Sequence, residues 1–278
     1  MSRIKCRLPV QTMREVKKMK QTIKCALLYV LLPVMLVTLP FAVQAFAAGD
    51  GTPYDWYFKP NGDHTQPEVL PEATFLKDFK NVLYLGPADV KVLYLTFDAG
   101  YDNGNTGKIL DVLKEKNAPG AFFVDGNFVK SNPDLVKRID AEGHLLGDHS
   151  LSHADMSSLS DFEKYKQQIT GWEDLVKKAG TSPTKYFRFP CGRFSKRALE
   201  YNEKLGLKSV FWSFAYYDWD TNEQPGENAA LAKMIERTHN GEILLLHAVS
   251  STNAEILGEY IDKMRALGYR FGALTELA

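Results

Sequence analysis

The chain has 278 residues, of which 45% are hydrophobic and 24% charged, a composition that can bury a full-sized core and excludes disordered and disulfide-scaffold proteins. The 34 basic and 34 acidic residues balance, but eight of the basic side chains and a single acidic one fall within residues 1–24. The rest of the chain is therefore mildly acidic and lacks a basic cluster, which argues against nucleic acid as a partner.

An export segment is predicted at the N-terminus. The basic start is followed by an apolar run over residues 26–43 and by the small-residue pattern Ala45-x-Ala47, an order typical of a secretory signal peptide. The apolar run is also close to the length that spans a bilayer. We therefore assign residues 1–48 to a signal peptide or an N-terminal membrane anchor. Either assignment exports the rest of the chain, which contacts the membrane only if this segment stays uncleaved.

Residues 49–89 are expected to form an N-terminal extension that packs on the main domain. The segment begins with a polar stretch rich in Pro and Gly, in which the aromatic run Trp56-Tyr57-Phe58 is embedded. We expect these rings to pack on the core, although they could instead lie at the edge of a site.

From residue 90 onward, short apolar runs alternate with amphipathic helical segments. Runs without in–out alternation predict a parallel sheet covered by helices on both faces, an α/β fold. Such a sheet is either a barrel or an open doubly wound sheet, and the barrel is preferred because no glycine-rich phosphate turn follows the first strand. The lack of that turn also argues against a nucleotide-binding protein. The predicted strands are Val90–Phe97, Ala121–Val124, His144–Gly147, Tyr186–Phe189, Ser209–Phe214, Ile243–Leu246 and Tyr269–Gly272.

Two of the intervening helices have recognisable N-termini. Ser160–Glu163 and Thr252–Glu255 match the capping box, in which a hydroxyl and a carboxylate three residues apart accept hydrogen bonds from free backbone N–H groups. We therefore expect helices to begin after Ser160 and Thr252.

Polar side chains follow five of the seven predicted strands. The carboxyl ends of parallel barrel strands meet on one face, which is where barrel enzymes build their active sites. Five ionisable groups converging on this face indicate catalysis rather than a structural polar network. The groups are Asp98, Asp148 with His149, Arg188, Asp218 with Trp219, and His247.

His149 and His153 are spaced four residues apart, which in a helical turn would direct both imidazoles at one divalent cation. Taken alone this spacing is a weak signal, because two surface histidines after a strand are common. Asp98 and His247 on neighbouring strand ends strengthen the signal. Together with the two histidines they could provide a site for a metal-bound water, a carboxylate base and an acid for the leaving group.

Arg188-Phe-Pro-Cys191-Gly would present a guanidinium at the rim of the site. Arginine can orient a carboxylate through two parallel hydrogen bonds, and the backbone N–H of Cys191 could face a developing oxyanion. Cys191 is the only cysteine beyond the export segment, so it has no internal disulfide partner. We expect its thiol to be a small buried group rather than a nucleophile.

Taken in order, five motifs resemble those of the polysaccharide deacetylase family, the NodB-type carbohydrate esterases. The resemblance assigns residues 90–278 to a catalytic domain and implies a TIM-like, distorted (β/α) barrel with about seven parallel strands. It also implies metal-assisted removal of an N- or O-acetyl group from a polymeric sugar. The motifs are Thr96–Gly100, His149–His153, Arg188–Gly192, Asp218–Asp220 and Leu245–His247.

The resemblance assigns catalytic roles to four residues by position. Asp98 matches the base that deprotonates the attacking water, and Arg188 matches the residue that orients this base. His247 matches the acid that protonates the departing amine, and Asp218 matches the residue that tunes His247.

The expected metal site departs from the family pattern. His149 and His153 match two metal ligands, but Ala99 replaces the aspartate that usually supplies the third. Asp102 is the nearest carboxylate that could take over. We therefore expect a divalent ion to be bound weakly, and the sequence does not distinguish zinc, manganese, magnesium or cobalt.

The stretch TFDAGYDNG, together with Tyr217–Asp220 and His247–Ser250, resembles the N-acetylmuramic acid deacetylases of Bacillus-type spore-formers. This implies N-deacetylation of peptidoglycan strands, which leads to muramic δ-lactam in the spore cortex. The protein would then act at the cell wall or spore envelope, and an amidase would act before it. Trp219 would wall the acetyl pocket, with Tyr101 and Cys191 assigned to substrate binding. The alternatives are a deacetylase of chitin-type, N-acetylglucosamine or O-acetylated polysaccharides, and a non-catalytic wall-binding module.

Overall fold

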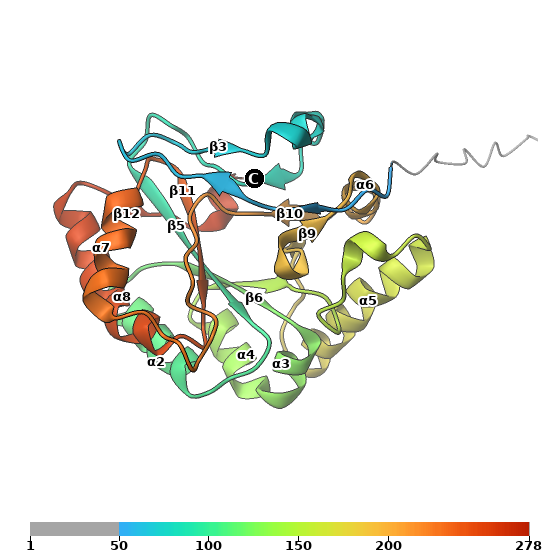
Figure 1. The fold of residues 1–278 in the computed structure, drawn as a ribbon. Coiled ribbons are helices and arrows are strands. Elements are labelled where there is room, and N and C mark those ends of the chain that lie inside the picture. The colour runs from blue at the N-terminus through green and yellow to red at the C-terminus, as the bar shows by residue number, and fades with distance from the viewer. Residues whose placement is uncertain (1–49, 278) are drawn as a thin grey trace, which may run out of the picture. The chain divides into compact units, whose positions relative to one another are not determined.

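The computed structural model describes residues 50–277 (Figure 1). The export segment predicted over residues 1–48 lies outside the described residues. Within residues 50–277, no helix combines the length and the apolar character needed to cross a membrane.

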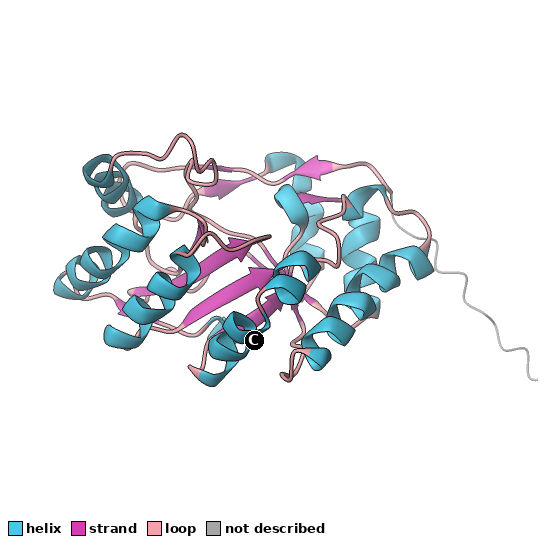
Figure 2. Cartoon of the chain, turned by 90° about the horizontal axis from the view of Figure 1, so that it is seen from below, coloured by secondary structure: helices cyan, strands magenta, loops and turns pink. Residues whose placement is uncertain are grey.

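A curled sheet of parallel strands forms the centre of the fold, with helices around it (Figures 1 and 2). Seven strands follow one another in the order β11-β5-β6-β7-β8-β10-β4, and β12 pairs with the first residues of β5. A bridge between Phe214, beyond β10, and Leu244 brings the two sides of the curl together. The predicted distorted barrel is therefore confirmed. Its strands are β4 (Val82–Leu83), β5 (Val92–Ala99), β6 (Gly120–Val124), β7 (Leu145–Asp148), β8 (Tyr186–Phe187), β10 (Lys208–Val210), β11 (Glu242–His247) and β12 (Arg270–Phe271).

All seven predicted apolar runs overlap strands of this sheet, but one strand was not predicted. β4 comes from the segment expected only to pack on the barrel, and it pairs Val82 and Leu83 with Ser209 and Val210 of β10. Two residues are too short a run to give a strand signal. The predicted strand Ser209–Phe214 is also cut short, because from Ser213 onward the chain hydrogen-bonds with β11.

The register places the carboxyl ends of the central strands level with one another. Asp98 of β5 lies opposite His247 of β11, and Ala99 lies opposite Val124 of β6. Val124 in turn lies opposite Asp148 of β7. Residues that close these strands therefore gather at one mouth of the barrel.

β5 alternates between two apolar cores. Leu93 and Phe97 pack in a core with helix residues outside the barrel, whereas Val92 and Tyr94 pack in the core inside it. Because side chains alternate along a strand, Asp98 shares the inner side with Val92 and Tyr94, and it points into the barrel mouth.

The helices pack around the outside of the sheet, and side-chain caps fix where several of them begin (Figure 2). Asp161 and Ser250 are the N-caps of two helices, each accepting a hydrogen bond from a backbone N–H of the first turn. The caps predicted at Ser160 and Thr252 are therefore wrong by one and two residues, because the neighbouring side chain takes the N-cap position. The helices are α2 (Asn105–Glu115), α3 (Gly126–Ser131), α4 (Pro133–Ala141), α5 (Phe162–Lys178), α6 (Lys196–Lys204), α7 (Glu227–Arg237) and α8 (Ser251–Ala266), with 3-10 turns at Pro71–Asp78, Met156–Ser158, Pro190–Gly192 and Leu274–Leu277.

The N-terminal extension crosses the barrel beside β9 and β10 (Figure 1). Its strand β1 (Tyr54–Asp55) pairs with β9 (Arg193–Phe194), and β2 (Phe58–Lys59) pairs with β3 (Glu68–Val69). Trp56 is buried in the inner core, while Tyr57 is exposed. Phe58 is half-buried and packs against the same core, so two of the three rings contact the core.

Candidate active site

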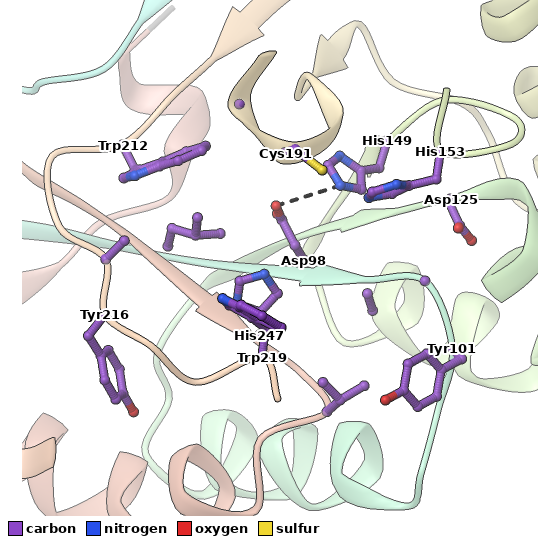
Figure 3. A pocket seen from close by; sticks show the side chains of 16 residues that line it. Asp98, Tyr101, Asp125, His149, His153, Cys191, Trp212, Tyr216, Trp219 and His247 are labelled. Atoms are coloured by element: carbon purple, nitrogen blue, oxygen red, sulfur yellow. Dashed lines mark ion pairs between the residues drawn. The ribbon is translucent and has the colours of Figure 1, made fainter. Parts of the chain in front are cut away.

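A pocket of about 760 Å³ opens at the carboxyl ends of the barrel strands (Figure 3). Most of the residues predicted for the site line it or lie directly behind it. Ten polar and aromatic side chains in its lining are Asp98, Tyr101, Asp125, His149, His153, Cys191, Trp212, Tyr216, Trp219 and His247.

Asp98 lies on the floor of the pocket and is held by a buried arginine. Arg188 Nη1 donates to Asp98 Oδ1 at 2.8 Å, and the guanidinium is fully buried. Burial alone would raise the pKa of Asp98, but the positive charge and hydrogen bond of Arg188, with the nearby histidines His149 and His247, hold that pKa below its ordinary value. Asp98 is therefore ionised at neutral pH.

The Arg188 guanidinium is fixed on all sides. Nε donates to Val210 O at 3.2 Å and Nη2 donates to Phe211 O at 3.4 Å. The guanidinium carbon lies 4.2 Å from the centre of the Phe123 ring and 5.6 Å from that of Trp212. These contacts leave Nη1 aimed at Asp98 and compensate the cost of burying the charge.

His247 faces Asp98 across the pocket floor and is paired with Asp218. His247 Nδ1–H donates to Asp218 Oδ1 at 2.7 Å, and the backbone N–H of His247 donates to Oδ2 at 2.8 Å. Asn253 Nδ2 also donates to Oδ2, which leaves the fully buried Asp218 carboxylate well hydrogen-bonded. Burial would lower the pKa of His247, but the Asp218 hydrogen bond and charge, with Asp98, raise it above its ordinary value of 6.5. The Nε2 edge is left for the pocket.

His149 and His153 lie together on another wall of the pocket, with ring centres 4.9 Å apart (Figure 3). No helical turn joins them, because both Ser150 and His153 have positive φ and the segment is a loop. His149 Nδ1–H donates to Arg188 O at 2.9 Å, and Nε2 lies 3.7 Å from Asp98 Oδ2. Burial lowers the pKa of His149 to about 4, so its imidazole is neutral at neutral pH.

The three residues assigned to substrate binding all line the pocket. Tyr101 and Trp219 expose about half of their surface, at 48% and 53%. Cys191 is also exposed, so the expectation of a buried thiol is wrong. The cause is the backbone of the Pro190–Gly192 turn, in which Cys191 and Gly192 both have positive φ and a side chain at position 192 would lie 2.7 Å from Trp212.

Asp102 is not among the pocket-lining residues. Its two carboxylate oxygens accept hydrogen bonds from the backbone N–H groups of Gly104 and Thr106, at the start of α2. The structure therefore assigns this carboxylate a capping position rather than a place beside the imidazoles.

Asp125 lines the pocket and was missed in the sequence. It directly follows the strand Ala121–Val124, so the strand-end pattern that selected Asp98 also points to it. Its Oδ1 accepts the Phe128 N–H at 2.8 Å. Burial raises the pKa of the Asp125 carboxyl, although hydrogen bonds to backbone N–H groups and the nearby His153 oppose the rise.

The described side chains do not fit a tightly held metal ion. Within residues 50–277, no group of three or more His, Cys, Asp or Glu side chains is arranged to hold one. His149 and His153 form a pair of imidazole donors, the Ala99 methyl cannot coordinate, and Asp102 is engaged elsewhere. A two-imidazole set lacks the carboxylate that completes a three-ligand site.

Comparison with known proteins gives consistent matches. The family model described as polysaccharide deacetylase matches residues 86–210. An N-acetylmuramic acid deacetylase of peptidoglycan from Bacillus subtilis is 40% identical over 236 residues, which cover 85% of this chain and 89% of that protein. An uncharacterised 30.6 kDa protein of Geobacillus stearothermophilus is 42% identical over 87% of this chain and 92% of its own length. The solved structure of the Bacillus subtilis enzyme, a family 4 carbohydrate esterase, has a TM-score of 0.79 at 38% identity, covering 82% of this chain and 98% of that one.

Proposed function

Because this chain belongs to the polysaccharide deacetylase family, we propose that it hydrolyses the N-acetyl amide of N-acetylmuramic acid in peptidoglycan strands. The observation that carries the proposal is the pairing of Asp98 with His247 on adjacent strand ends, each held by a buried partner of opposite charge. An ionised carboxylate and an imidazole of raised pKa at one mouth form the acid–base pair that amide hydrolysis needs.

In the proposed reaction, Asp98 accepts a proton from a water molecule as the water oxygen attacks the amide carbonyl carbon. Arg188 holds the carboxylate so that one oxygen is bonded and the other faces the pocket. The same charge lowers the basicity of Asp98, so positioning contributes more than proton affinity. The N–H of Cys191, in the turn that lines the pocket, is the proposed donor to the oxyanion.

His247 completes the reaction by donating the Nε2 proton to the amide nitrogen, and the C–N bond then breaks to give acetate and the free amine. Asp218 keeps Nδ1 of His247 hydrogen-bonded and so directs Nε2 to the pocket. Its buried charge also stabilises the imidazolium that must be present before the proton is given up. No step of this scheme uses a metal ion, because the donor set does not fit one; His149 and His153 would hold an added divalent ion weakly.

Muramic acid is preferred as the substrate because the relative with 40% identity acts on it and is matched over most of its length. In that setting the product amine can close to the muramic δ-lactam of spore cortex, and an amidase that strips the stem peptide would act first. The substrate requires an exported enzyme, in agreement with the export segment that the sequence predicts over residues 1–48. A complete acid–base pair argues against a non-catalytic wall-binding module.

Mass spectrometry of muropeptides after incubation with the purified protein tests the proposal. The expected result is loss of acetyl from muramic residues, with acetate released from muramic-containing strands and not from chitin oligomers under identical conditions. Equal rates on the two substrates would assign the protein to the chitin-type deacetylases. Intact acetyl groups on both would overturn the proposed activity.

A further inference from the structure

Two exposed aromatic rings lie side by side at the edge of the pocket. Tyr217 and Trp219 have ring centres 4.7 Å apart and expose 46% and 53% of their surface. Trp219 lines the pocket, whereas Tyr217 is not part of its lining. The pair therefore carries a contiguous apolar surface from the pocket outward.

The loop that carries both rings is fastened to the barrel. Gln224 Nε2 donates to the carbonyl oxygens of Asp218 and Asp220 at 2.9 and 2.7 Å. Gln224 Oε1 accepts from Ser250 Oγ, the N-cap of α8, at 2.6 Å. The rings are thus held in place before a ligand arrives, which reduces the entropy lost on binding.

Two acidic residues act on the hydroxyl of the outer ring, Tyr217. The Tyr217 hydroxyl donates to Asp220 Oδ2 at 3.3 Å, and partial burial together with the charges of Asp220 and Glu223 raises the pKa of this hydroxyl. A ligand seated on Tyr217 therefore meets the Asp220 carboxylate, with the charge of Glu223 nearby. A sugar that carries its own carboxylate is repelled there, while a neutral sugar can donate a hydroxyl hydrogen bond to Asp220.

We propose that Tyr217, Trp219 and Asp220 form a second sugar-binding subsite, which holds the neutral N-acetylglucosamine next to the muramic residue in the catalytic pocket. The inference rests on the proposed function, in which the substrate is a polymer and must continue past the pocket. In peptidoglycan the two sugars alternate and only muramic acid bears a lactyl group. A subsite that accepts the neutral sugar therefore decides which of the two alternating sugars enters the catalytic pocket, and it places muramic acid over Asp98.

Binding by an inactive protein separates this subsite from the reaction. In the Asp98→Asn background, calorimetric titration with a peptide-free N-acetylglucosamine–N-acetylmuramic acid hexasaccharide should give a Kd about tenfold higher for Tyr217→Ala. Tyr217→Phe should keep the affinity. Tyr57→Ala is the matched control, since Tyr57 is equally exposed at 48% and its hydroxyl also lies near a carboxylate, that of Glu72. An unchanged Kd for Tyr217→Ala would overturn the subsite even if deacetylation fails in every form.

The choice of sugar in the catalytic pocket is measured from the products of the active protein. Asp220→Asn should gain deacetylation of N-acetylglucosamine residues in the same strands, because a muramic residue can then occupy the subsite. Mass spectrometry of the separated sugars gives the ratio of the two products. A ratio that matches the unmodified protein would show that Asp220 does not select the neighbouring sugar.

Discussion

The two sides of the catalytic pocket differ in how completely their polar groups are paired. Asp98 is bonded to a buried arginine, and Asp218 accepts three hydrogen bonds, two of them from His247. On the other side, His149 and His153 stand together on a loop without a carboxylate ligand at position 99. The groups proposed to move protons are therefore set in place in advance, while the groups that would hold a cation are incomplete.

The largest effect is expected on the completed side. Asp98→Asn keeps the shape of the side chain and can still accept the Arg188 hydrogen bond, but it cannot take a proton from water. His247→Ala removes the acid. Each change should lower kcat by about 10²–10⁴-fold with an unchanged fold. Steady-state acetate release measures the kcat of each variant, and circular dichroism is the folding control. A variant that keeps half the activity would contradict the role assigned to that residue.

The second-largest effect is expected on the pH dependence of activity. His247 must be protonated to act, so activity falls as the pH rises through a pKa above 6.5; Asp98 must be ionised, so activity falls as the pH drops through a pKa below 3.8. Asp218→Asn removes the charge that raises the pKa of His247. It should lower kcat by roughly 10–100-fold and move the alkaline limb to lower pH. An alkaline limb that stays in place would show that Asp218 does not tune His247.

Ala99→Asp should complete the metal-ligand set that His149 and His153 begin. Ala99 is 3% exposed, so a carboxylate there costs about 1–3 kcal/mol unless it is paired. We expect a lower melting temperature without metal and a clear rise on adding zinc, with a much smaller rise in the unmodified protein. Ala99→Asn, of equal size but uncharged, is the control. Equal zinc-induced shifts in all three proteins would contradict the account of position 99.

The smallest effect is expected behind the pocket. The Trp56 indole N–H donates to Trp212 O at 2.9 Å, and its backbone N–H donates to Gly192 O. Trp56→Phe keeps the ring but loses the first bond, which should lower kcat a few-fold and cost about 0.5–1.5 kcal/mol. Tyr165→Phe loses a buried hydrogen bond to Asn202 in the same core and should cost similar stability without lowering kcat. Equal kcat losses would show a general effect of weakened packing.

Much of the site could be predicted because strand ends are visible in the sequence. Apolar runs located Asp98 and His247, and parallel strands bring such residues to one mouth whatever lies between them. The same pattern also marks Asp125. What it could not give was backbone geometry. His153 and Cys191 have positive φ, so no helical turn joins the two histidines, and the expected burial of the Cys191 thiol was wrong.

The fold shows the same division. The apolar runs from residue 90 onward predicted the parallel sheet, whereas β4 at Val82–Leu83 has too few residues to give a signal and is specified by pairing with β10. The caps at Asp161 and Ser250 were displaced because several neighbouring side chains could cap, and only the path of the chain decides between them.

Metal content tests the contrast between the two sides most directly. The purified, dialysed protein should hold far less than one divalent ion per chain by elemental analysis, and calorimetric titration with zinc or manganese should show weak binding. Two neutral imidazoles offer no charge to offset the cation. A stoichiometric ion that survives dialysis would show that another residue has replaced the missing aspartate, and the description of this side as incomplete would be wrong.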